Sequence, residues 1–320
     1  LAAQLVARVR AVAGVELAMA TVFERPTIAG LAPRLAAGRA EASTLPAIVA
    51  GEESAWAPLS FSQQRLWFLE QLVPGQTTYH VSALLRLRGQ LDVAALRRAL
   101  DELVARHAAL RTVFADVAGQ GQQRALPAGS VEMGEEDLRE LPAVERTAAV
   151  LARAARRAGE RFDFARGPFL RVSLYRTEAD EWRLLIATHH IVSDGWSISV
   201  AVRELAELYA AARAGRPPAL PEPELQYADY ARWQRGWMRD RVLAEKLAFW
   251  KVNLAEAPPI DLPTDLARPA VLSGRGARVP FALSAAATEA LNEMAREQGA
   301  TLFMVLLAAF TAWLRRESGQ

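Results

Sequence analysis

Hydrophobic side chains alternate with polar ones along short stretches of the chain, which predicts β-strands. In residues 81–87 an apolar side chain stands at every odd position, and Gly89 follows the run. Residues 182–187 are rich in branched and aromatic side chains and come after a turn-like acidic segment. Residues 169–175 alternate in the same way. We therefore expect a strand at 81–87 and a pair of neighbouring strands at 169–175 and 182–187.

Elsewhere the apolar residues repeat at helical spacing. A helix is predicted after Asp92, a good N-cap, and another is predicted to begin near Trp196 or Ser197. Their apolar faces consist of Leu96, Leu100, Leu103 and Val104 in the first helix, and of Ile198, Val202, Leu205 and Tyr209 in the second.

The last hundred residues predict mainly helices. A long aromatic helix is expected from Tyr227 to beyond Trp250, followed by a proline-rich extended segment. A strand at 278–283 and a helix at 284–298 come next. The apolar run 302–314 is too short to span a bilayer, so we expect it to be a buried helix.

The N-terminal region has a different organisation. Residues 1–40 are predicted to be helical, with Gly14 ending one helix and Thr27 capping a short one. So few helices bury too little surface to fold alone, which indicates a fragment of a domain. Residues 41–57 have little periodicity and are predicted to be a linker.

Composition excludes several classes of function. Apolar residues make up 52% of the chain, charged residues 23%, and the net charge is +2. This balance gives no reason to expect a nucleic acid or an anionic membrane as partner. The chain has no cysteine and 4 histidines, so a thiolate nucleophile is excluded and a metal site is not expected. No secretory signal is visible, and a cytoplasmic location is expected.

Candidate chemistry is concentrated where the strand at 182–187 runs into the next helix. His189 and His190 stand at the strand end, and Asp194-Gly195 makes the turn into the helix at Trp196-Ser197. Because side chains alternate along a strand, the two histidines should point to opposite faces. Only one of them can then face a given cleft.

The pattern HHxxxDG resembles the core motif of condensation domains of nonribosomal peptide synthetases, which belong to the chloramphenicol-acetyltransferase-like acyltransferases. The resemblance implies that His190 is catalytic and that His189, Asp194 and Gly195 support it. It also implies that Asp194 is structural and pairs with an arginine, for which Arg106 and Arg111 are the candidates. Trp196 and Ser197 are candidates for the substrate tunnel.

Further segments extend this resemblance along the chain. Residues 59–69 resemble the opening motif of the family, residues 106–114 the second, with Ala108 where glutamate is usual, and residues 227–233 the fourth. Residues 23–31 resemble the end of a peptidyl carrier domain. The resemblance implies a carrier remnant at 1–40, a linker at 41–57 and a condensation domain at 58–320, whose first lobe runs to about 255.

The implied fold is α+β, a two-layer sandwich of the chloramphenicol-acetyltransferase type with the start of a second lobe. The implied reaction is amide-bond formation, in which a carrier-bound amine attacks an upstream carrier-bound thioester. His190 could act as a general base or could position the amine. No cofactor is expected in the domain itself, because the substrates are attached to the phosphopantetheine of carrier domains. The serine that carries this phosphopantetheine is expected outside this chain.

The implied partners are an upstream donor carrier, a downstream acceptor carrier and an adenylation domain. Alternatives are a coenzyme-A-dependent acyltransferase of the same fold and a non-catalytic module that docks carriers. With the second lobe cut short, we expect this chain to be inactive alone.

Overall fold

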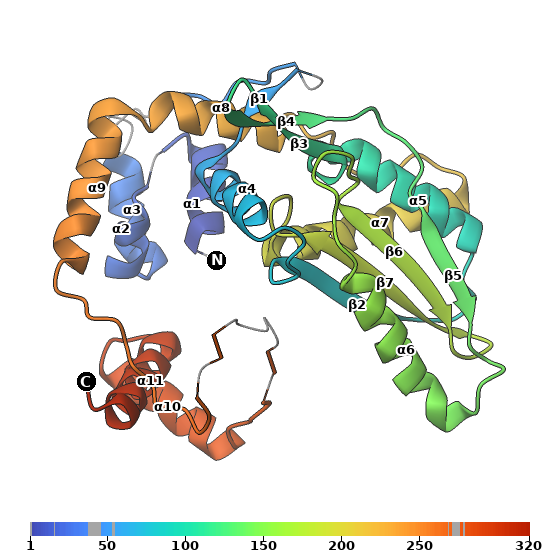
Figure 1. The fold of residues 1–320 in the computed structure, drawn as a ribbon. Coiled ribbons are helices and arrows are strands. Elements are labelled where there is room, and N and C mark those ends of the chain that lie inside the picture. The colour runs from blue at the N-terminus through green and yellow to red at the C-terminus, as the bar shows by residue number, and fades with distance from the viewer. Residues whose placement is uncertain are drawn as a thin grey trace.

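A computed structural model of the protein describes residues 2–15, 17–37, 46–52, 55–267, 269–270, 276–277 and 279–320. Its centre is a four-stranded sheet with the order β2-β7-β6-β5 (Figure 1). Strand β5 runs parallel to β6, and the other pairs are antiparallel. The strands are β2 (His80–Arg88), β5 (Met133–Asp137), β6 (Leu170–Arg176) and β7 (Glu181–His189).

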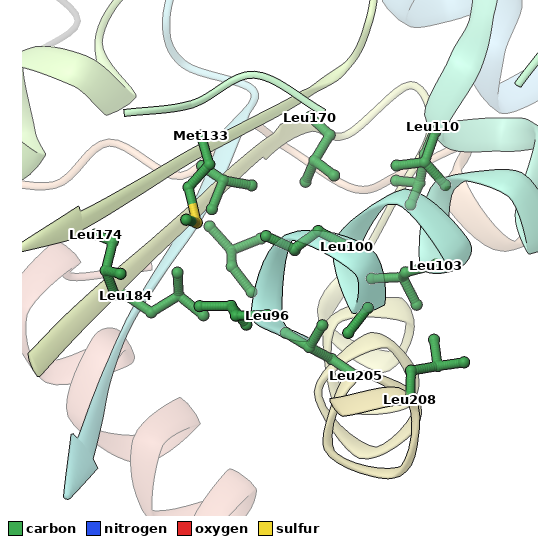
Figure 2. Close-up of a cluster of buried hydrophobic side chains, with 14 of the residues drawn as sticks. Leu96, Leu100, Leu103, Leu110, Met133, Leu170, Leu174, Leu184, Leu205 and Leu208 are labelled. Atoms are coloured by element: carbon green, nitrogen blue, oxygen red, sulfur yellow. The ribbon is translucent and has the colours of Figure 1, made fainter. Parts of the chain in front are cut away.

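Helices cover both faces of this sheet, because alternate residues of β7 bury their side chains on opposite sides. Leu184 and Ile186 pack with helices α5 (Val93–Arg106) and α7 (Gly195–Ala214). Leu185 packs with α6 (Ala143–Ala158) on the other face. Leucines from α5, α7 and the sheet fill the main core (Figure 2). The predicted α+β class is confirmed. The predicted sandwich has two layers, whereas in the structure helices pack on both faces of this sheet.

A second sheet of three strands, in the order β1-β4-β3, lies beside α4 (Phe61–Leu72). Ser60 caps α4 in a capping box with Gln63. The Gln63 amide also hydrogen-bonds the buried side chain of Gln123 in β4, at 2.9 Å. The strands are β1 (Ala57–Pro58), β3 (Thr112–Val117) and β4 (Gln120–Ala125).

The paired strands and the main helices confirm the sequence-based expectations. Strand β6 pairs with β7, and β2 covers the predicted strand at 81–87. Asp92 caps α5 by accepting a hydrogen bond from the Ala95 N–H at 2.9 Å. The N-terminal region is helical, as predicted, with α1 (Ala2–Ala13), α2 (Met19–Glu24) and α3 (Ile28–Ala37), whose first turn is capped by Thr27; α2 was not predicted as a separate helix.

Three expectations for the C-terminal part are wrong. The predicted long helix breaks into α8 (Tyr227–Trp237) and α9 (Asp240–Leu254), and Asp240 has a positive φ of 48° at the break. Residues 279–283 form no strand, since no described segment pairs with them, and Arg278 lies outside the described residues. No residue of α11 (Leu302–Ser318) is buried.

Helix α10 (Ala285–Glu297) matches the helix predicted at 284–298, with Ser284 as its N-cap. Thr301 likewise caps α11. Among the described helices, none is by itself long and apolar enough to cross a membrane. The pair α10 and α11 meets those criteria of length and composition only together, with a bend of 105° between them.

Candidate active site

The two histidines at the end of β7 differ in exposure, in line with the predicted opposite orientation of their side chains. His189 is the last residue of β7 and is buried, with only 2% of its surface exposed. His190 begins the turn that follows and is exposed. The end of the strand therefore buries the ring of His189 and leaves that of His190 accessible to a substrate.

His189 stands in an aromatic cage formed mainly by phenylalanines. Its ring centroid lies 5.1 Å from that of Phe164 and 5.7 Å from that of His80. The ring Nδ1 accepts a hydrogen bond from the Ile191 N–H at 3.0 Å. Burial, and after it the charges of His80 and His190, lower the pKa of His189 to about 3. His189 is thus a neutral structural residue that holds the turn.

The imidazole of His190 is fixed by the turn itself. Its backbone N–H donates to the Tyr79 carbonyl at 2.8 Å, and its Nδ1 lies 3.1 Å from the Ser193 carbonyl oxygen. A carbonyl can only accept, so this contact requires a proton on Nδ1. In the neutral ring, Nε2 then carries the lone pair. His190 is held in the tautomer that can accept a proton or a hydrogen bond at Nε2.

His190 lines a hollow of about 510 Å³ at the end of the sheet. Arg65 and Tyr227 border it, although the sequence patterns predicted no role for them in the site. Both lie in segments that resemble family motifs, so the signal that could have found them was motif membership. The other residues that line the hollow are Ser62, Leu66, Thr78, Tyr79, Ile191, Val192, Ser193, Asp194 and Ser197.

Asp194 is the N-cap of α7. Its Oδ1 accepts hydrogen bonds from the Ser197 N–H at 2.8 Å and the Ser197 hydroxyl at 2.6 Å. The bond from the Ser197 hydroxyl, and after it the bond from the Ser197 N–H, lowers the pKa of the Asp194 carboxyl. A capping carboxylate at a helix N-terminus is stabilised by the free N–H groups and the helix dipole. Asp194 therefore orders the turn that carries His190.

The predicted ion pair between Asp194 and Arg106 or Arg111 is not present among the described residues. The guanidinium of Arg106 is buried and approaches Glu204 at 3.4 Å, Glu222 at 3.5 Å and the Pro221 carbonyl at 2.6 Å. Burial would raise the pKa of Glu204, but hydrogen bonds from His107 and Arg106 outweigh it, so the pKa is lowered.

Arg111 donates to the carbonyls of Val104 and Ala105, each at 3.2 Å, and to that of Leu126. Val104 and Ala105 belong to the last turn of α5, whose carbonyls have no partner within the helix. Arg111 therefore binds where the end of α5 leaves backbone carbonyl groups without a hydrogen-bond donor. Arg111 thus binds the end of α5, and Arg106 joins α5 to α7 and to the loop at Pro221, while Asp194 is hydrogen-bonded within its own helix.

The remaining motif residues lie at the start of α7. A Cβ added to Gly195 would meet no atom within 4 Å, so packing does not require this glycine. Ser197 lines the His190 hollow, whereas the exposed Trp196 lines a neighbouring apolar pocket. The Asp194 carboxylate already caps the N-terminus of α7. This helix end is therefore poorly suited to hold an oxyanion. No group of three or more candidate metal ligands occurs within the described ranges.

Comparison with known proteins covers the whole chain. The sequence is 44% identical over 324 residues to one of the linear gramicidin synthase proteins of Brevibacillus parabrevis, covering 100% of this chain and 4% of that protein. It is 40% identical over 324 residues to a phosphinothricin tripeptide synthetase of Streptomyces viridochromogenes, covering 100% of this chain and 27% of that protein. The chain thus spans a small part of these relatives.

Solved structures show the same fold. The X-domain from teicoplanin biosynthesis superposes with a TM-score of 0.75 at 34% identity, covering 85% of this chain and 60% of that chain. The first condensation domain of the CDA synthetase matches with a TM-score of 0.67 at 22% identity, covering 83% of this chain and 63% of that chain. The sequence profile of the condensation domain matches residues 53–320. The chain therefore belongs to the condensation domain family of nonribosomal peptide synthetases.

Proposed function

We propose that this chain contributes the His190 side of a condensation site that forms an amide bond between two carrier-bound substrates. The amine of the acceptor attacks the donor thioester carbonyl, so that a C–N bond forms and the C–S bond breaks. The amine proton passes to Nε2 of His190 and then to the departing thiolate. The observation that carries the proposal is the accessible His190 with its Nδ1 hydrogen-bonded to the Ser193 carbonyl.

His190 supports this chemistry without a cofactor group of its own. An Nε2 lone pair can accept a hydrogen bond from the attacking amine, which orients it, and can take the proton as the bond forms. A thioester is already activated, and tethering raises the local concentration of both substrates. The fixed imidazole supplies the proton acceptor at the point where the two meet.

The wider organisation follows from the same proposal. Residues 1–40 are taken as the end of a peptidyl carrier domain, 41–57 as a linker and 58–320 as condensation-domain sequence. In support, the gramicidin synthase protein matches 100% of this chain, whereas the family profile begins at residue 53. Donor and acceptor carriers bring the substrates on phosphopantetheine, an adenylation domain supplies activated amino acids, and we place the assembly in the cytoplasm.

The test compares His190→Ala with His190→Gln in the synthetase that contains this chain. Carriers loaded with donor and acceptor are supplied, and the dipeptidyl product is followed by mass spectrometry. We expect His190→Ala to lower the rate about 10²–10⁴-fold, the usual contribution of general acid–base catalysis, with an unchanged melting temperature. Wild-type rates in both variants would refute the assignment.

The glutamine variant separates the two roles of the imidazole. Its amide oxygen can accept a hydrogen bond where Nε2 stands but cannot take up a proton at neutral pH. A rate near that of His190→Ala would show that proton transfer matters. A rate near wild type in His190→Gln alone would assign His190 to positioning of the amine.

A further inference from the structure

A second pocket lies next to the His190 hollow, at the edge of the main core. Its volume is about 220 Å³, and it shares Val192, Ser193, Ser197 and Tyr227 with that hollow. The pocket is therefore separated from the hollow by the thickness of single side chains.

The walls of this pocket are hydrocarbon. Leu100 and Leu103 line it from α5, Leu110 from the short 3-10 helix Ala108–Arg111 and Leu170 from β6; all four are labelled in Figure 2 and belong to the main core. Ile198 and Ala201 line it from the first turns of α7. An unfilled apolar cavity lowers the stability of a fold. A pocket of this kind left open beside a reactive histidine is suited to an apolar ligand.

Most of the polar side chains that line the pocket are already hydrogen-bonded within the protein. Thr188 and Ser193 bond each other through their hydroxyls, and the His107 ring bonds Glu204 at 2.7 Å. The Tyr227 hydroxyl bonds the Ser60 hydroxyl at 3.0 Å, and Ser197 bonds Asp194. Little hydrogen-bonding capacity is left for water or for a polar ligand.

We propose that this pocket binds the branched aliphatic or phenyl side chain of an amino acid substrate while its reacting group lies at His190. A dry cavity of about 150 Å³ accommodates benzene, so the volume of about 220 Å³ is sufficient for such a side chain. Trp196 and Tyr227, which line the pocket, are both exposed to solvent. The inference rests on the proposed function only for the nature of the ligand.

Binding of stable substrate analogues to the chain tests the pocket. The probes carry leucine or glycine joined to pantetheine by an amide in place of the thioester. A free α-amine represents the acceptor, and an N-acetyl group represents the donor, so the two arms identify which substrate uses the pocket. We expect the leucyl probe of one arm to bind about tenfold or more tightly than its glycyl counterpart, measured by calorimetry and NMR titration.

Ala201→Leu should fill the pocket and abolish the preference for leucine. Ala210→Leu is the matched control, since it makes the same change at an exposed position of α7 that lines neither pocket. Should Ala201→Leu fail to fold, Ile198→Ala serves instead, because a wider pocket should shift the preference towards a phenylalanyl probe.

Three results would each overturn the proposal. The first is equal binding of leucyl and glycyl probes in both arms, and the second is no binding of any probe. The third is a leucine preference that survives in a folded Ala201→Leu chain. No product is formed in this binding measurement, so it is independent of the proposed chemistry. If the unmutated chain prefers leucine and Ala201→Leu removes that preference, the pocket is assigned even where full activity of His190→Ala rejects the proposed chemistry.

Discussion

The burial of His189 makes the stability of the fold depend on pH. Its pKa is lowered to about 3 in the folded chain, whereas an unfolded histidine titrates near 6.5. Between these values the unfolded state binds more protons, so the protein loses stability as pH falls below about 6.5. Burial also lowers the pKa of His80, which acts in the same direction.

We therefore expect the free energy of unfolding to fall by about 1.6 kcal/mol between pH 6.5 and pH 5 from His189 alone. Urea denaturation across this range measures it. His189→Asn removes the titrating ring and keeps an acceptor for the Ile191 N–H. Its stability profile should be flatter by about 1.1 kcal/mol per pH unit over this range. The same slope in the variant and the wild type would assign the acid sensitivity to other groups.

At the scale of elements, the start of α7 depends on Asp194 as a cap and not as one member of an ion pair. Loss of an N-cap typically costs about 1 kcal/mol, whereas stranding one partner of a buried ion pair costs about 3–5 kcal/mol. We expect Asp194→Ala to lower the free energy of unfolding by about 1 kcal/mol. Asp194→Asn, which still caps a helix, should remain close to wild type.

A double-mutant cycle with Arg106→Ala distinguishes the two possibilities directly. Arg106 is bound to Glu204 and the Pro221 carbonyl, so it should not be coupled to Asp194. The coupling energy should be below about 0.5 kcal/mol, as for independent sites. A coupling of several kcal/mol would restore the ion pair that the sequence suggested.

Local patterns predicted those elements whose stability comes from their own side chains. Alternation predicted β2, β6 and β7, and the cap Asp92 marked the start of α5. Strand β4 was missed because its sequence is QGQQRA. It is held by backbone pairing on both sides and by the buried side-chain bonds of Gln123. Such pairing is tertiary and leaves no hydrophobic period.

The same limit applies to the candidate site. The opposite orientation of His189 and His190 follows from strand geometry alone. The tautomer of His190 depends on where the Ser193 carbonyl lies after the turn, which no residue pattern encodes. The partners of Arg106 were unpredictable for a related reason, since Glu204, in α7, reaches it only through the packing of α5 on α7.

At the scale of the whole molecule, apolar surface is distributed unevenly. The sheet and its helices bury their apolar faces, but α9 and α11 have no buried residue. Contiguous apolar surface of this kind promotes association in soluble proteins. The large exposed side chains are Leu247, Phe249 and Trp250 in α9, and Phe303, Met304, Phe310 and Trp313 in α11.

We expect the 320-residue chain to self-associate in solution, because burial of these side chains between copies removes apolar area from water. Sedimentation velocity over increasing protein concentration should show a rising average mass. Trp250→Glu combined with Trp313→Glu should lower that mass towards the monomer. Leu151→Glu provides the control, since Leu151 is equally exposed but lies in α6, far along the chain from these helices. A chain that stays monomeric, or that responds equally to the control, would show that these apolar faces do not drive association.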